Sequence, residues 1–344
     1  MKKLFSLLKL ILIQLIILFV LLEVGTRIYR AVSVSVYNSK LLLDDDTLGW
    51  RVASNYKTED IAPGFGKVRY TTQRDGFRVW GDAKTKKIKV FFIGDSFSQA
   101  RGVGDGNCLY DAFKKQSDSI EVFAYGCGGY GSLQESLLLE KYIKEIDPDI
   151  IVWQFCLNDI KDNSYDFDAA SIGNQLRTRP YLVGGKVEQL FPKKHFGWVF
   201  KYSKFLQLLS LKINAMGNIA AAKDFMEGRG VDDPLVQDGL AKTHEIMRRT
   251  KKIAGNKTLV AFSANSMLTM GVNAWANDSI AAICKQANIP FIAGVTDSLY
   301  KHQKAGEKID GYPPDGHWNA RGHAIAGKII YDYIKQKELL RKVE

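Results

Sequence analysis

Short motifs spread along the chain hold side chains that together could carry out acyl transfer. The first is Gly94-Asp95-Ser96, which follows an apolar run that begins at Ile88. A serine at a turn from strand to helix stands beside the free backbone N–H groups of the helix start, which favour negative charge. Ser96 is therefore a candidate nucleophile, although serine in this position also serves as a helix cap.

Two further motifs offer hydrogen-bond donors. Residues 126–131 contain four glycines in six positions, and glycine lets the backbone approach a ligand closely. A backbone N–H there, with Gly129 the best candidate, can donate to an oxyanion. The loop lacks the Gly-Lys-Ser/Thr of a phosphate-binding P-loop. Asn158 follows the next apolar run and offers an amide donor, although Asn is also common in turns.

A candidate base lies near the C-terminus. The chain has five histidines, and His317 is the one with a carboxylate close by, at Asp315. A histidine oriented by a carboxylate is the general base that a serine nucleophile requires. A metal site built from Asp315, His317 and His323 is the alternative. We disfavour it because no further ligand cluster accompanies these residues.

The elements that must position these motifs alternate between strand and helix. Short apolar runs predict strands, and longer amphipathic segments predict helices. The predicted strands are 88–93, 120–124, 150–155, 258–262 and 290–292, and the predicted helices are 133–146, 237–254, 274–287 and 320–337. This rhythm predicts an α/β fold with a doubly wound, mostly parallel five-stranded sheet and helices on both faces. The motifs would then meet at the carboxyl edge of the sheet.

On these motifs the chain resembles the SGNH hydrolases, also called the GDSL family, over about residues 88–334. Gly94-Asp95-Ser96 is similar to the first family block, whose Ser is the nucleophile. Gly129 matches the glycine of the second block and Asn158 the asparagine of the third. His317 matches the base of the last block.

The resemblance implies a flavodoxin-like fold and a definite site. Ser96, His317 and Asp315 would form a catalytic triad, and Ser96, Gly129 and Asn158 would form the oxyanion hole. No metal or organic cofactor is implied. The third block usually has Gly where Cys156 stands, and Asp315 precedes His317 by two positions instead of the usual three.

The predicted function is a serine-nucleophile hydrolase of an O-acyl ester, with an ester of a cell-envelope glycan as the expected substrate. An O-acyltransferase to a polysaccharide remains an alternative, since alginate-type O-acetyltransferases share the Asp-x-His spacing. A second alternative is a non-catalytic glycan-binding module on the same scaffold. Such a module would have lost the Ser or the His, and this chain keeps both Ser96 and His317.

The N-terminus predicts a membrane anchor at residues 1–27. Residues 4–22 are interrupted only by Ser6, Lys9 and Gln14, and roughly 20 apolar residues span a bilayer. A cleaved signal peptide is the alternative, but the sequence after Leu22 offers a poor cleavage site. We expect one membrane-spanning helix, with the folded domain outside the cytoplasm.

Composition bears on the expected partners, on the state of the cysteines and on the domain layout. The net charge is +11, yet the basic residues are scattered and no nucleic-acid-binding motif is present, so we expect no nucleic-acid partner. The four cysteines match no metal spacing, and buried thiols or disulfides are both open. The expected layout is a lead-in at 28–87 and a hydrolase-like domain at 88–340, with an insertion at about 160–236 that breaks the strand–helix rhythm.

Overall fold

The computed structural model describes residues 2–32, 41–62, 66–171, 176–193, 197–210, 212, 229–265, 274–311 and 316–340. Its main sheet contains β5 (Ile88–Gly94), β6 (Ile120–Gly126), β7 (Ile150–Phe155), β10 (Thr258–Ser263) and β11 (Phe291–Ile292). The strand order is β11-β10-β7-β5-β6, and every ladder is parallel. In chain order this is the flavodoxin-like arrangement 2-1-3-4-5, whose switch point lies between β5 and β7. The predicted fold class is therefore confirmed.

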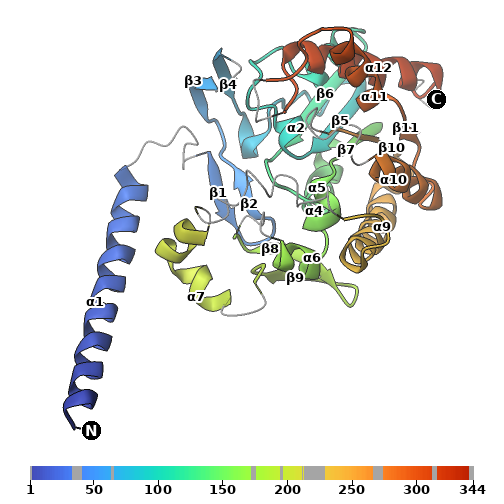
Figure 1. The fold of residues 1–344 in the computed structure, drawn as a ribbon. Coiled ribbons are helices and arrows are strands. Elements are labelled where there is room, and N and C mark those ends of the chain that lie inside the picture. The colour runs from blue at the N-terminus through green and yellow to red at the C-terminus, as the bar shows by residue number, and fades with distance from the viewer. Residues whose placement is uncertain are drawn as a thin grey trace.

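Helices cover both faces of this sheet (Figure 1). They are α2 (Ser96–Gln99), α3 (Leu109–Lys114), α4 (Ser132–Ile146), α5 (Asn158–Asp162), α6 (Tyr165–Ala170), α9 (Pro234–Ala254), α10 (Ala274–Gln286), α11 (Val295–Lys304) and α12 (Ala320–Gln336). The four predicted helices correspond to α4, α9, α10 and α12. Prediction missed the short helices α2, α3, α5 and α6 and also α11, a ten-residue, mostly polar helix that buries only Val295, Thr296 and Leu299.

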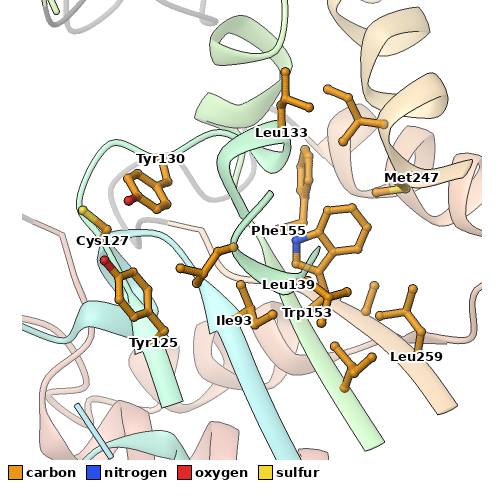
Figure 2. Packing of buried hydrophobic residues seen from close by; sticks show 14 of the residues in the cluster. Ile93, Tyr125, Cys127, Tyr130, Leu133, Leu139, Trp153, Phe155, Met247 and Leu259 are labelled. Atoms are coloured by element: carbon orange, nitrogen blue, oxygen red, sulfur yellow. The ribbon is translucent and has the colours of Figure 1, made fainter. Parts of the chain in front are cut away.

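The core forms two clusters, one on each face, because side chains alternate along every strand. On β5, Phe91 and Ile93 join the cluster under α4, α9 and α10, whereas Val90 and Phe92 join the cluster under α3, α11 and α12. Figure 2 shows the first cluster, in which Trp153 of β7 lies among residues of the sheet and of α4 and α9. The strands are buried on both sides, which explains their nearly continuous apolar sequence.

The lead-in forms two antiparallel hairpins packed on the main body. They are β1 (Leu42–Asp45) with β2 (Gly49–Val52), and β3 (Lys57–Ala62) with β4 (Gly66–Thr71), followed by the 3-10 turn η1 (Arg74–Gly76). Val79 then forms an antiparallel bridge with Ala124 of β6. The lead-in thus reaches the edge strand of the sheet.

The region after α5 contains a third hairpin, β8 (Arg179–Val183) with β9 (Lys186–Leu190), and then α7 (Gly197–Tyr202). Figure 1 places this hairpin and α7 on the same side of the body as α1 (Lys2–Val32), which projects away from it. Residues 3–29 of α1 are long and apolar enough to cross a membrane. All four cysteines are buried free thiols.

Candidate functional site

Ser96 and His317 meet although they are far apart in the sequence. His317 Nε2 lies 2.8 Å from Ser96 Oγ. Ser96 is the first residue of α2, directly after β5, and His317 lies in the loop before α12. Both residues are partly buried, so they border solvent. A ring nitrogen at this distance can take the hydroxyl proton.

Aromatic packing sets the position of the His317 ring. Phe97 lies against it with ring centroids 4.7 Å apart, and Trp318 packs edge-on against Phe97 at 5.0 Å. Trp318 is only 1% exposed, and its Nε1 donates to the Asn265 carbonyl. Asn319 then accepts from two backbone N–H groups at the start of α12. The loop that carries His317 is therefore held by the packing of Trp318 and by the Asn319 cap at the start of α12.

The predicted Asp–His pair and the metal alternative involve Asp315 and His323 besides His317. Asp315 lies outside the described residues. His323 is buried, and its Nδ1 accepts from the Leu109 backbone N–H at 3.2 Å. Burial, with the charges of Arg78 and His317, lowers the pKa of His323 to about 3, so this ring is a neutral packing group. In the described part of the chain no three His, Cys, Asp or Glu side chains gather as a metal site.

Gln154 of β7 fixes the turn that carries Ser96. Its Oε1 accepts from the backbone N–H groups of Asp95 and Ser98, both at 3.1 Å, and from Ser98 Oγ at 2.9 Å. Its Nε2 donates to Asp95 Oδ1 at 2.8 Å. A Cβ on Gly94 would lie 2.2 Å from Gln154 Oε1, so only glycine leaves room for this side chain. One amide from the neighbouring strand thus holds both sides of the Ser96 turn.

Among the described residues, no Lys or Arg forms an ion pair with the carboxyls beneath this turn, and the charge of His317 lowers the pKa of Asp95 less than burial raises it. Asp95, Glu135 and Asp159 are each about 1% exposed or less. Burial raises the pKa of Asp95. Burial and the Asp95 charge raise the pKa of Glu135 well above its usual range. Burial and the charges of Glu135 and Asp95 do the same for Asp159. The three groups disfavour one another's ionisation, so protons are retained here to higher pH than on free carboxyls.

The glycine loop lies directly against the Ser96 turn. The Gly128 N–H donates to Gln99 Oε1 at 2.9 Å, and a Cβ on Gly128 would lie 3.9 Å from Ser96 Cβ. A Cβ on Gly126 would overlap the Gln99 backbone nitrogen at 2.0 Å. Gly129 has φ of +75°, a conformation that favours glycine. The spacing of glycines is therefore set by close approach of two backbones.

Asn158 lies at the start of α5 and is held by two acceptors. Its Nδ2 is 3.1 Å from Asp162 Oδ2 and 3.4 Å from the Tyr130 carbonyl. The second contact ties Asn158 to the end of the glycine loop. An incoming oxyanion would compete for the donor that makes this longer, weaker bond.

Arg179, the first residue of β8, connects both of these loops. Its Nη2 donates to the Gly129 carbonyl at 3.0 Å, and its Nη1 lies 3.0 Å from Asp162 Oδ1. Its guanidinium also sits over the Trp50 ring at 5.0 Å. Arg179 is 1% exposed. One residue of the insertion therefore holds the carbonyl of Gly129 and the carboxylate that holds Asn158.

A buried ion network completes this support. Lys161 pairs with Asp162 and, at 3.0 Å, with Asp168. Tyr181 donates to Asp168 Oδ2 at 2.7 Å. The charges of Lys161 and Arg179 outweigh burial and lower the pKa of Asp168. Two cations thus face two carboxylates beside the glycine loop.

The lead-in also contacts the site. Arg78 is buried and donates to the carbonyls of Gln99 and Ala100 at 2.6 and 3.1 Å, which caps the end of α2. Trp50 Nε1 donates to the Gly128 carbonyl at 3.2 Å, and Tyr130 OH donates to the Trp50 carbonyl at 2.6 Å. Both α2, which begins with Ser96, and the glycine loop are therefore held by residues before position 88.

Of the predicted site residues, the structure brings Ser96 and His317 into contact and places the glycine loop beside Ser96. Asn158 joins that loop through the Tyr130 carbonyl. Sequence reasoning missed Gln154 and Arg179. Gln154 carried a signal, a polar residue inside an apolar strand, whereas Arg179 carried none because its partners come from distant segments.

Comparisons with known proteins give structural matches only. No family model and no curated protein matches the sequence. A member of the lipolytic G-D-S-L family from Veillonella parvula matches with TM-score 0.43 and 12% identity, covering 72% of this chain and 98% of that one. A family 3 carbohydrate esterase from Clostridium thermocellum has TM-score 0.41, 14% identity and coverages of 73% and 97%. A catalytic mutant of an acetylxylan esterase from Geobacillus stearothermophilus has TM-score 0.41, 13% identity and coverages of 72% and 93%.

Proposed function

We propose that this chain is a serine ester hydrolase that acts on an O-acyl ester through an acyl-enzyme. The observation that carries the proposal is the 2.8 Å contact between His317 Nε2 and Ser96 Oγ. A nucleophile and its base within hydrogen-bond reach, at the carboxyl edge of a parallel sheet, are what this chemistry requires.

In the first step His317 Nε2 takes the Ser96 Oγ proton, and Oγ attacks the ester carbonyl carbon. The resulting oxyanion would accept from the Ser96 and Gly129 backbone N–H groups and from Asn158 Nδ2. The C–O bond to the leaving group then breaks, and His317 returns the proton to the departing alkoxide. Asp315 is assigned the role of orienting the His317 ring, on the family resemblance.

In the second step water attacks the acyl-enzyme, with His317 again the base. A sugar hydroxyl in place of water would make the same site an O-acyltransferase, so the two functions differ only in the acceptor. We assign water as the acceptor because Ser96, His317, Gly129 and Asn158 are all partly exposed to solvent. The substrate class proposed is an acyl ester of a cell-envelope glycan, in line with the apolar α1 and the net charge of +11.

We also propose that α1 anchors the chain in a membrane as a single span, with the remaining domain outside the cytoplasm. Its described residues 3–29 contain no buried stretch that would make them a core helix. A core helix of a soluble domain would bury an apolar stripe, whereas α1 exposes apolar side chains all round.

The test is hydrolysis of p-nitrophenyl acetate by the full chain in detergent, with acetate release measured from acetylated glycans. Ser96→Ala and His317→Ala should each lower kcat by at least about 10³-fold. Ser119→Ala and His302→Ala, at positions away from the site, should leave the rate unchanged. Equal rates in all four variants would refute the mechanism. If acetyl transfer to an added oligosaccharide is faster than acetate release to water, the chain is an O-acyltransferase and the hydrolase assignment is wrong.

A further inference from the structure

The end of α1 is joined to the insertion by specific polar contacts. Glu23, the first charged residue after the apolar run of residues 4–22, accepts from Ser203 Oγ at 2.8 Å and from the backbone N–H groups of Lys204 and Phe205, both at 3.0 Å. Residues 204–210 are helical, so Glu23 caps a helix that belongs to another part of the chain.

Two more contacts join the same segments. Arg27 Nη2 donates to the Tyr202 carbonyl at 2.8 Å. The rings of Phe19 and Phe205 meet edge-to-face with centroids 6.1 Å apart. Figure 1 shows α7 beside the half of α1 that is nearer the body, while the N-terminal half projects freely. The segment 197–210 is therefore seated where the apolar part of α1 ends.

This segment turns large apolar side chains outward. Trp198 is 71% exposed, Tyr202 66% and Leu209 41%. Outside α1, the other large hydrophobic side chains that are exposed in the described chain belong to Leu43, Val183 and Val187, each near 40% or less. Exposed Trp and Tyr on a soluble surface are unfavourable, but both residue types favour the interface between membrane and water.

The charges near these side chains are basic. Lys201 and Lys212 are exposed, and Lys204 is partly exposed. Lys193 Nζ lies 5.6 Å from the Phe200 ring, within the same segment. Lysines close to an anionic bilayer are attracted to its headgroups and strengthen binding. Aromatic side chains flanked by lysines match a lipid headgroup layer better than a neutral glycan.

We infer that residues 197–210 lie on the surface of the membrane that α1 spans, with Trp198 and Tyr202 inserted among the headgroups. This inference rests on the proposed anchor. It implies that α1 is a permanent part of the fold, because Glu23 supplies the cap of the segment. It also places the hairpin β8–β9, which begins at Arg179, next in sequence to a membrane-bound element.

The experiment is spin-label accessibility on the full chain in nanodiscs of three parts phosphatidylethanolamine and one part phosphatidylglycerol. The native cysteines are all buried, so single surface cysteines at positions 198, 202 and 209 can be labelled. Positions 183 and 187 on β8–β9 are matched controls within the insertion, and position 12 of α1 reports on the anchor itself. Collisions with oxygen and with a water-soluble nickel chelate are compared at each position.

Labels at 198 and 202 should favour oxygen over nickel at least severalfold more than labels at 183 and 187. Adding Glu23→Ala should make the label at 198 more mobile and leave position 12 in lipid. If position 12 is in lipid but 198 and 202 behave like 187, the inference fails and the anchor stands. If position 12 is accessible to nickel, the anchor proposal itself fails. Protection of 198 only after a polysaccharide is added would also overturn the inference, in favour of a glycan surface.

Discussion

Two buried polar regions meet at the glycine loop, and the pKa values of their carboxyls are shifted in opposite directions. Under the Ser96 turn, Asp95, Glu135 and Asp159 lie together, no Lys or Arg in the described part of the chain pairs with them, and their pKa values are raised. On the other side of the loop, Asp162 and Asp168 face Lys161 and Arg179, and the pKa of Asp168 is lowered. We call these the acid cluster and the ion network.

The difference shows that burial alone does not decide the ionisation of a carboxyl. Every one of these carboxyls is nearly inaccessible, and desolvation by itself raises the pKa of a buried carboxyl. At Asp168 the charges of Lys161 and Arg179 reverse this effect. Glu135 of the acid cluster lies on α4 and Asp159 on α5, whereas the ion network includes Arg179 of β8. The insertion therefore adds a second cation to Lys161, which α5 itself supplies.

The largest effect is expected from Arg179→Met. The change leaves Asp162 and Asp168 with Lys161 as their remaining basic partner in the described network, and unpairing a buried charge costs about 3–5 kcal/mol. Chemical denaturation of the full chain in detergent should show a loss of that size. Arg177→Met, whose guanidinium lies over the same Trp50 ring at 5.5 Å, should cost clearly less. Equal losses would mean that ring contact, and not the ion network, accounts for the stability.

The next effect tests the other region through Gln154→Ala. This substitution removes the acceptor for the Asp95 and Ser98 N–H groups and the donor to Asp95. A misplacement of about 1 Å at a reacting group can cost about 10²-fold in rate, so kcat for p-nitrophenyl acetate should fall on the order of 10²-fold. Gln154→Glu keeps the oxygen acceptor but adds a fourth carboxyl to the acid cluster, so it should restore little. Full activity in Gln154→Ala would show that the Ser96 turn keeps its conformation without the Gln154 hydrogen bonds.

Sequence sufficed for the parts whose signal is local. The five strands are mostly apolar runs, and Gly94 and Gly126 stand at the ends of β5 and β6. Ser96 and His317 lie in short motifs. Arg179 could not be recognised, because its role comes from Gly129, Asp162 and Trp50, which reach it only in the folded chain.

The same limit applies to the insertion as a whole. Sequence predicted that residues 160–236 break the strand–helix rhythm, and the structure shows a hairpin and short helices there. Nothing local indicated that Glu23 would cap the helix at 204–210. A carboxylate at the end of an apolar helix has many uses, and the choice depends on a segment about 180 positions away.

A smaller and more specific effect is expected from Arg179→Lys. Lysine keeps the charge in the ion network, so stability should fall far less than in Arg179→Met, but it cannot donate to the Gly129 carbonyl and Asp162 together as the guanidinium fork does. The kcat should fall about tenfold with KM little changed. This result is expected if Arg179 positions the Gly129 N–H, because that group would donate to an oxyanion present only in the transition state. Arg177→Lys is the matched control. A rise in KM at constant kcat would instead assign Arg179 to substrate binding.

The smallest effect should come from Glu135→Gln, which reports on the acid cluster through pH. A carboxyl with a raised pKa in the folded state binds more protons than the unfolded chain, so its stabilising effect is complete below pH 4.5 and declines as the pH rises through the folded value. The wild-type chain should therefore lose stability from pH 5 to pH 9. In Glu135→Gln the side chain keeps an acceptor for Trp153 Nε1 and cannot ionise, so unfolding midpoints should fall less over the same range. Glu140→Gln, at an exposed position of the same helix, should follow the wild type. Parallel profiles in all three proteins would mean that Glu135 is ionised throughout, and that Asp95 and Asp159 hold the protons of this cluster.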